Sequence, residues 1–323
     1  MSTFLARTCL LAFTIAALLG GCGGGSGDIL RLRIDGAVDR PTAASLGDLQ
    51  AQPSVTQTVT FNSGTTPQTH TYTGANLWAL LNSVGLQTDA SRKNDLLNRY
   101  VLATGADGYR SVFSLGELNP EFGNKPSLVA YAETLNGGSS NLTDVDGPFR
   151  VTAPGDVKGG RYVSNLQRLE VRPSGSAVAG TGGGVSPSFA VSGAVNTPMI
   201  FDLAALQKLP VVSQTVGGSV YTGANLWALL NTTTGIKTDA AVKNATLGMY
   251  AVATGSDGYK ALVALGEIDP GFGNRQVLVA YSVNGAALGG TGVARMVVPG
   301  DNKASRSVSN LVSLEVFTAL PAP

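Results

Sequence analysis

Cysteine is almost missing from this chain. Only Cys9 and Cys22 occur among its 323 residues, and both precede residue 23. From residue 23 onward there is no thiol to form a disulfide, to bind a metal or to act as a nucleophile. The folded parts must therefore be stabilised by their apolar cores, for which an apolar content of 43 % is sufficient.

Charge is also scarce, and neither sign prevails. Charged residues make up 13 % of the chain, with 22 Lys plus Arg against 21 Asp plus Glu. No basic cluster is interleaved with aromatics, so we expect no nucleic-acid partner. His70 is the sole histidine. One imidazole cannot form a metal site without help from carboxylates, and we interpret His70 as a surface residue before a strand.

The chain has no apolar run long enough to span a bilayer. The apolar stretch 10–19 is interrupted only by Thr14, and its length is typical of a signal-peptide core. Leu19-Gly20-Gly21-Cys22 follows and resembles the lipobox of bacterial lipoproteins, in which the cysteine becomes the lipidated first residue. We expect a signal peptide at 1–22, lipidation of Cys22 and a flexible tether at 23–27. The alternative is an ordinary signal peptide that contains a cysteine.

This reading places the protein in the bacterial cell envelope, with the membrane as a partner through the lipid anchor. Gly23 stands after the lipidated cysteine where an aspartate would signal retention, which favours the outer membrane. The sequence does not decide between the periplasmic and the surface side.

The chain repeats itself. YTGANLWALLN occurs at 72–82 and again at 221–231, and ATGADGY at 103–109 matches ATGSDGY at 253–259. The segments 115–124 and 150–166 recur at 265–274 and 295–311. A period of about 150 residues indicates a duplicated domain. We predict copy 1 at 28–172, a flexible Gly/Ser-rich linker at 173–187, copy 2 at 188–318 and a tail at 319–323, with each copy able to fold alone.

Local patterns indicate short helices between strands. Thr73 is a plausible N-cap for a helix whose buried face carries Leu77, Leu80, Leu81 and Val84. A hairpin is expected at 100–113, short helices after Ser114 and Asp202, and strands at 128–131, 150–152 and 167–171. The interleaving predicts an α/β fold (α+β possible) with a mixed sheet and short helices in each copy.

The order of motifs in each copy resembles the molybdopterin-binding domain of the sulfite oxidase family. That order is a G-x-V start, a short D-L helix, Y-T-G-x-x-L-W-x-L-L, D-G-Y, L-V-A-Y, R-x-x-x-P-G-D and a closing L-E-V strand. The resemblance implies a compact fold that, in catalytic members, holds a pyranopterin and an oxo-molybdenum centre. In those members a cysteine before the Y-T-G segment ligates the metal.

Here the corresponding segment, 59–64, has no cysteine, and its counterpart 215–219 is shorter. Soft thiolate is the ligand such a metal needs. The signal also has Arg7 alone instead of the arginine pair used to export proteins already loaded with a cofactor. We therefore expect no metal site and no cofactor, with molybdopterin possible through the resemblance.

The candidate binding site of each copy is the basic turn within its R-x-x-x-P-G-D segment, which starts at Arg150 or Arg295. Three cations surround a Pro-Gly-Asp turn in each copy, and together they could hold an anion. The candidate anion or cofactor ligands are Arg150, Lys158, Arg161, Arg295, Lys303 and Arg306. In the resembling family, basic residues of this region help to bind the cofactor's phosphate. The alternative is a solvated turn in which Asp156 or Asp301 pairs with one cation.

Three functions remain open from the sequence. The first is a non-catalytic binding or structural lipoprotein of the cell envelope with two similar pockets and a small anionic ligand. The second is a molybdopterin-dependent oxidoreductase, and the third is a passive surface interaction module. Whether the chain is an enzyme is undecided, and the missing thiol weighs against it.

Overall fold

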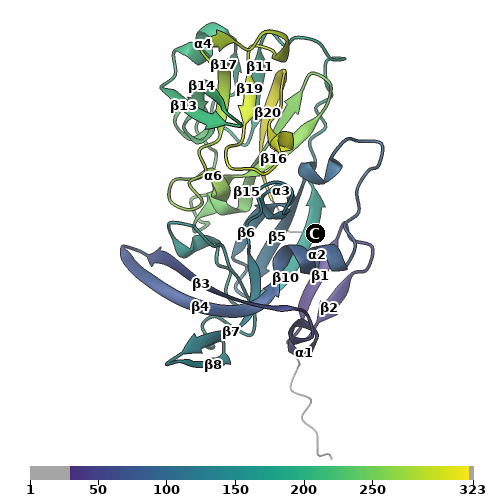
Figure 1. Ribbon diagram of the computed structural model, residues 1–323, viewed down its shortest axis with the longest axis vertical. Helices are drawn as coiled ribbons and strands as arrows, with labels where there is room; N and C mark the ends of the chain where they lie inside the picture. Colours follow the sequence, from purple (N-terminus) through teal and green to yellow (C-terminus); the bar gives the residue numbers. More distant parts are fainter. Residues whose placement is uncertain (1–29, 320–323) are drawn as a thin grey trace, which may run out of the picture.

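The computed structural model describes residues 30–319. The expected signal peptide, the lipidation site Cys22, the tether and the tail after 319 lie outside the described residues. Within 30–319, no helix is both long and apolar enough to cross a membrane. Figure 1 shows the two copies stacked along the long axis of the molecule, with copy 1 below copy 2.

Copy 1 is built from two five-stranded sheets. One has the order β2 (Thr42–Ala44), β1 (Leu32–Gly36), β10 (Leu166–Pro173), β5 (Arg99–Gly105), β6 (Arg110–Ser114). It is mixed, because β1 and β10 run parallel while the other pairs are antiparallel. The other sheet has the order β3 (Ser54–Ser63), β4 (Thr66–Asn76), β7 (Leu128–Leu135), β8 (Gly138–Asn141), with β9 (Arg150–Val151) also on β7.

Copy 2 repeats both sheets in the same order. The first consists of β12 (Met199–Phe201), β11 (Phe189–Gly193), β20 (Leu311–Thr318), β15 (Met249–Gly255) and β16 (Lys260–Ala264). The second consists of β13 (Val211–Val216), β14 (Ser219–Asn225), β17 (Leu278–Val283), β18 (Ala286–Ala287) and β19 (Arg295–Val297). The β13–β14 hairpin is shorter than β3–β4, which curves out from copy 1 in Figure 1.

The helices are short, as the sequence predicts. The α-helices are α1 (Leu46–Gln50), α2 (Leu77–Ser83), α3 (Leu115–Leu118), α4 (Leu203–Gln207), α5 (Leu226–Ala228) and α6 (Leu265–Ile268). The 3-10 turns are η1 (Asp95–Asn98), η2 (Gly159–Arg161), η4 (Ala245–Gly248), η5 (Gly289–Thr291) and η6 (Ala304–Arg306), and η3 (Leu229–Thr234) is π-helical. The expected α/β class with mixed sheets is confirmed.

The YTGANLWALLN motif is only half helical. Leu77, Leu80 and Leu81 are buried as expected, but the helix begins after Asn76, whose side chain accepts the amide hydrogen of Ala79. Thr73 lies in β4, so the prediction that it caps the helix is wrong. The residues before the helix pair with β7, and that pairing outweighs the local capping signal.

The two copies share a buried interface. Tyr100, Leu102 and Val112 from β5 and β6 pack with Tyr250 and neighbouring side chains of β15 and β16 in one apolar cluster. The contacts are reciprocal: Val157 donates its amide hydrogen to Phe272 (2.8 Å), and the equivalent Asn302 donates to Phe122 (2.9 Å). Such exchange is the property of an interface with approximate twofold symmetry.

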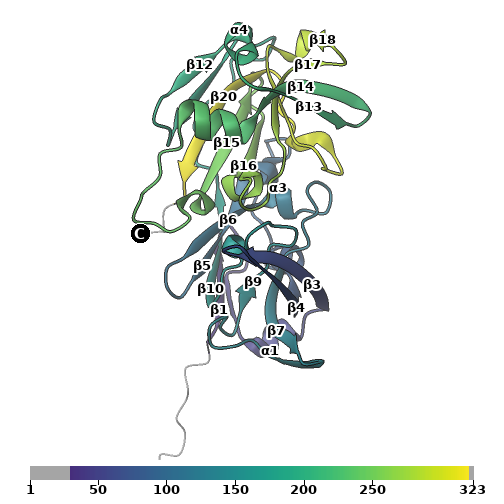
Figure 2. The same ribbon diagram turned by 90° about the vertical axis from the view of Figure 1, so that its left-hand side faces the viewer.

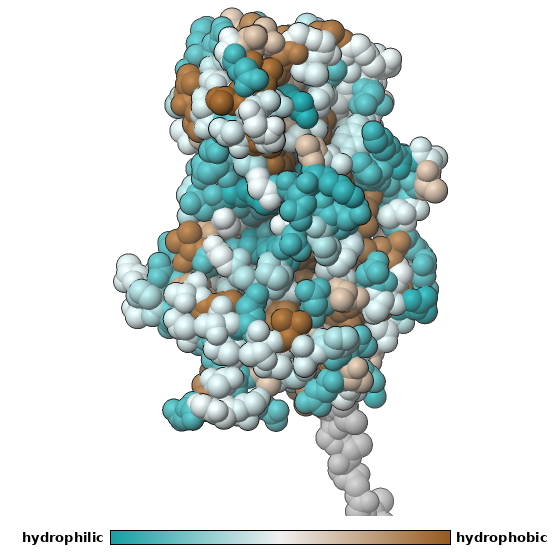
Figure 3. Space-filling model, in the orientation of Figure 1, coloured by the Kyte–Doolittle hydropathy of each residue, from teal (hydrophilic) through white to brown (hydrophobic). Residues whose placement is uncertain are grey.

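Figure 2 shows β6, α3 and β16 meeting at this junction. On the face drawn in Figure 3, hydrophilic side chains gather across the middle of the molecule, over the same junction.

The segment between the copies does not behave as a free linker. Thr181 and Gly183 donate their amide hydrogens to the carbonyl of Ser256 (2.7 and 2.9 Å), and Ser256 Oγ donates to Gly184 O. A side chain on Gly180 would place its Cβ 2.3 Å from Gly258 N. The expectation of a flexible linker is therefore wrong, since these glycines let the backbone lie directly on the β15–β16 turn.

Candidate functional site

Arg161, one of the predicted anion ligands, is completely buried and fully paired. Its Nε and Nη2 donate to Asp156 (2.7 and 2.8 Å), and its Nη1 donates to Glu117 (3.0 Å). Lys125 Nζ lies 2.9 Å from Asp156 and 3.7 Å from Glu117. Two cations thus balance two carboxylates, and no charge is left to bind an anion.

Arg306 repeats this arrangement in copy 2. It donates to Asp301 (2.7 Å from both Nε and Nη2) and to Glu267 (3.0 Å from Nη1), while Arg275 occupies the position of Lys125. The anion-site prediction is therefore wrong for Arg161 and Arg306. The part of the alternative that pairs Asp156 and Asp301 with a cation is right, although the pairs are buried and not solvated.

From the sequence, Glu117 and Glu267 are interpreted as residues at the start of short helices. The structure places both in the first turn of such a helix, but their carboxylates also have another role. Ser114 Oγ does accept the amide hydrogen of Glu117 (2.9 Å). The carboxylate itself is buried at 2 % exposure and binds Arg161. Burial raises the pKa of Glu117, but the positive charges of Arg161 and Lys125 outweigh it, and the pKa lies below its usual value.

Lys303 also departs from the prediction. Its ammonium pairs with Glu121 of copy 1 at 2.9 Å, with both side chains more than half exposed. Its role in the described structure is an interdomain surface ion pair.

Arg150 is a predicted ligand that lines the cavity of copy 1. The cavity has a volume of about 740 Å³ and lies between the β3–β4 hairpin, the turn at 106–109 and η2 of copy 1. Arg150 is 9 % exposed, forms a close ion pair with Asp146 and donates from Nη1 to Tyr72 Oη (3.1 Å). Within the described residues its Nε has no hydrogen-bond partner.

Aromatic rings surround this guanidinium. The centroids of Phe61, Tyr72 and Tyr162 lie 6.0, 5.6 and 5.6 Å from the Arg150 Cζ. His70 stacks between Phe61 and Tyr72, with 5.3 Å to each centroid. Burial raises the pKa of Tyr72 and of Tyr162, so both remain neutral phenols at physiological pH.

His70 lies within β4 and not before a strand, and its side chain is largely buried. Its Nδ1 lies 2.6 Å from Glu133 Oε1. The sequence could not predict this position of His70, because the residues that contact it belong to the neighbouring strands β3 and β7.

The Tyr162 hydroxyl is a second buried polar group without a partner in the described part of the chain. Tyr162 and Arg150 both line the cavity. Buried polar groups in folded proteins almost always have a hydrogen-bond partner, so each exception needs an explanation, such as a bound ligand or water. Lys158 also lines the cavity, is exposed, and forms no salt bridge with any described residue.

Copy 2 does not reproduce this wall. Arg295 keeps the cation over Tyr221 (5.6 Å) and also has an unpartnered Nε. Ser307 stands where copy 1 has Tyr162, and the shortened hairpin has no equivalent of Phe61 or His70. The expectation of two similar pockets is wrong, and the Arg295 site lacks the aromatic surroundings of Arg150.

Residues 27–177 match the family model described as the oxidoreductase molybdopterin binding domain. The match covers copy 1 and makes it similar to this family. Copy 2 shares its strand order and motifs. No curated protein matches the chain.

One solved structure similar to this chain is the sulfane dehydrogenase SoxCD from Paracoccus pantotrophus. The similarity covers 78 % of this chain and 61 % of that one, at 14 % identity and a TM-score of 0.36. The chain thus spans about three fifths of the length of that SoxCD chain.

The residues present fit the organic part of the family's cofactor better than its metal. The described residues contain no cysteine and no group of three or more His, Cys, Asp or Glu side chains arranged to hold a metal. Aromatic rings beside a guanidinium and an exposed lysine suit a planar, negatively charged molecule. The structure offers such a ligand a surface but offers a soft metal no thiolate.

Proposed function

We propose that this protein is a non-catalytic binding lipoprotein of the cell envelope, and that copy 1 binds one small anionic, planar ligand in the Arg150 cavity. The observation that carries the proposal is that two residues lining the cavity, Arg150 and Tyr162, each have a buried polar atom, Nε and Oη, without a hydrogen-bond partner among the described residues. An acceptor on a ligand satisfies the guanidinium, and the phenol donates a second hydrogen bond.

The charged side chains that line the cavity leave one net positive charge, three cations against the carboxylates of Asp107 and Asp146. Arg150 is largely neutralised by Asp146, but Lys158 adds an exposed positive charge without a salt bridge to any described residue. The rings of Phe61 and Tyr162 provide an apolar surface for a flat molecule. A molybdopterin-dependent oxidoreductase is the second candidate, which the family match of copy 1 favours.

Pterin-6-carboxylate is a suitable probe, since it combines a planar ring with one negative charge and is fluorescent. We expect it to raise the melting temperature of the full chain, whereas neutral pterin or inorganic phosphate alone has a smaller effect. Lys158→Ala should weaken binding of the probe, and the matched Lys303→Ala in copy 2 should not. Absence of saturable binding, or equal effects of both variants, would contradict the proposed site.

Metal analysis separates the two candidates. Protein purified from its native envelope should contain less than about one molybdenum per ten chains, because no described side chain supplies a thiolate. Stoichiometric molybdenum with a pterin would establish the oxidoreductase instead.

A further inference from the structure

The Arg150 cavity is not made by copy 1 alone. Its lining includes Lys243, Asn244 and Phe272, which all belong to copy 2. Asn244 Nδ2 donates to Tyr109 Oη (2.9 Å), and this phenol donates to Gly160 O (2.7 Å). The loop of copy 2 is thus fixed to the turn of copy 1 at the edge of the cavity.

The backbone of copy 2 holds these side chains in place. Asn244 adopts a left-handed conformation (φ 52°) directly before η4, which turns the chain at the cavity edge. Its neighbour Lys243 is exposed and has no salt bridge to any residue in 30–319. It therefore adds a positive charge from copy 2 to a lining in which Arg150 and Lys158 of copy 1 are matched by Asp107 and Asp146.

From this arrangement we infer that Lys243 of copy 2 is a ligand-binding residue of the copy 1 site, so that the anionic ligand is held between the two copies. The inference rests on the proposed function. It assigns the binding site to the duplicated chain as a whole and not to one family domain, which explains why the two copies are locked together by a reciprocal interface.

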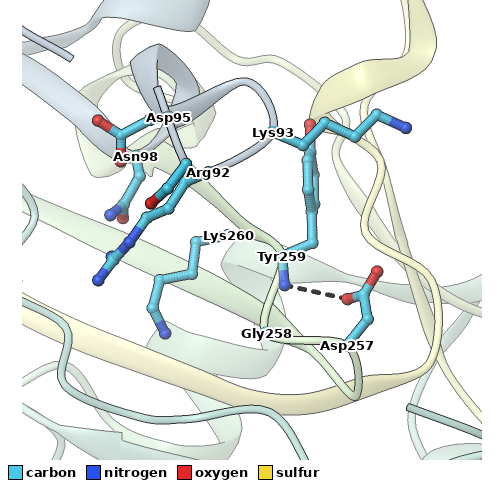
Figure 4. A pocket seen from close by; sticks show the side chains of 9 residues that line it. Arg92, Lys93, Asp95, Asn98, Asp257, Gly258, Tyr259 and Lys260 are labelled. Carbon is cyan, nitrogen blue, oxygen red and sulfur yellow. Dashed lines mark hydrogen bonds between the residues drawn. The ribbon is translucent and has the colours of Figure 1, made fainter. Parts of the chain in front are cut away.

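The approximate symmetry provides a matched control. The equivalents of Lys243, Asn244 and Tyr109 are Lys93, Asn94 and Tyr259, and Asn94 Nδ2 donates to Tyr259 Oη at 3.1 Å. Figure 4 shows Lys93 on the segment that passes Tyr259, next to the turn formed by Asp257 and Gly258. Lys93 of copy 1 is therefore the symmetry-related equivalent of Lys243 and lies in the same local structure.

The surroundings of Lys93 differ from those of Lys243. A smaller hollow of about 320 Å³ lies there, lined by Lys93 and by Gly183 and Gly184 of the segment between the copies. That segment is hydrogen-bonded to Ser256, as described above, and lies against this hollow. With Ser307 in place of Tyr162, the second position lacks the aromatic ring, and we assign the open ligand site to the Arg150 side only.

The test measures binding of pterin-6-carboxylate to the full chain by fluorescence anisotropy for Lys243→Ala, Lys243→Glu and the matched Lys93→Ala and Lys93→Glu. We expect Lys243→Ala to weaken binding about fivefold, the effect of one partly screened charge contact, and Lys243→Glu to weaken it further. Both Lys93 variants should stay within about twofold of the unaltered chain, because that lysine does not line the Arg150 cavity. Raising the salt concentration should reduce the difference between Lys243→Ala and the unaltered chain.

The outcomes are distinguishable. If Lys158→Ala weakens binding while the Lys243 variants equal the Lys93 variants, the inference is wrong and the proposed function stands. If the unaltered chain does not bind the probe saturably, both are overturned. Lys158, Lys243 and Lys93 are all exposed, so the variants should keep the melting temperature of the unaltered protein, and that temperature is measured alongside.

Discussion

Replacing Arg161 with methionine tests whether the buried ion clusters stabilise the molecule. The change keeps an unbranched apolar chain of similar length but removes the guanidinium, which is completely buried. Asp156 and Glu117 then share Lys125 as their remaining charged partner in the cluster. The ring of Phe113, whose centroid lies 5.0 Å from the Arg161 Cζ, also loses its cation.

The expected loss is large because the carboxylates stay buried. Removing one member of a buried, hydrogen-bonded ion pair costs about 3–5 kcal/mol of unfolding free energy. For a chain of this size that corresponds to a drop in melting temperature of about 5–8 °C. Lys303→Met is the control, since it removes an ion pair that is more than half exposed and worth about 0–1 kcal/mol.

The loss should depend on pH in one direction. The pKa of Glu117 is lowered in the folded chain, so this group stabilises the fold above its unfolded pKa of about 4.3, and the contribution is lost as the pH falls through the folded value. Without Arg161, the largest charge that lowers the pKa of Glu117 is gone while its burial stays, so we expect this pKa to rise and protonation to favour the folded variant more than the unaltered fold. The difference between the variant and the unaltered chain should therefore shrink as the pH is lowered from 7 to 4.

Calorimetry and urea unfolding at pH 7, 5.5 and 4 measure this difference. A drop of less than about 3 °C at pH 7, or a difference that is the same at pH 7 and pH 4, would refute the reasoning. The first result would mean that the cluster contributes specificity of packing rather than stability, and the second that titration of Glu117 does not contribute to the loss.

Three further predictions follow from the same structure. Gly160→Ala places a Cβ 2.3 Å from Phe272 Cε1 across the interface and should cost about 1–3 kcal/mol in urea unfolding, whereas Gly248→Ala, with no atom within 4 Å of its Cβ, should cost less than about 1 kcal/mol. The fragments 30–173 and 186–319 should self-associate or melt below the full chain, because each exposes half of the apolar cluster around Tyr100 and Tyr250. Their co-expression should yield a 1:1 complex in light scattering. Monomeric fragments as stable as the full chain would contradict this prediction. Cys22→Ala should release the protein from the membrane fraction, and a variant that still sediments with membranes after a salt wash would argue against lipidation.

The fragment prediction replaces the earlier expectation that each copy folds alone. That expectation came from a polar segment between two complete sets of motifs. The sequence does not show that Leu97 and Phe122 of copy 1 pack into the core cluster of copy 2. Nor does it show that the Gly-rich segment lies against the β15–β16 turn.

The buried state of Arg150 also changes what its replacement measures. From the sequence, Arg150 looks like an exposed turn residue whose loss leaves the fold intact. In the structure it is paired with Asp146 and enclosed by three rings, so its removal destabilises copy 1 as well as the site. Lys158 and Lys243 are for this reason the better probes of binding.

The sequence by itself determined the duplication, the short helices with Leu77, Leu80 and Leu81 facing the core, the hairpin around Asp107-Gly108 and the resemblance that the family match of copy 1 confirms. Each depends on repetition or on contacts within a few residues of the chain.

Tertiary structure alone decided which charges are free. Arg161 meets Glu117 across 44 residues and Lys243 reaches the cavity from the other copy, whereas Lys158 forms no salt bridge with any described residue and acts on Asp269 of copy 2 only through its charge. Arginines and lysines look alike in a motif, but their chemistry depends on burial and on long-range partners, which only the packed sheets supply.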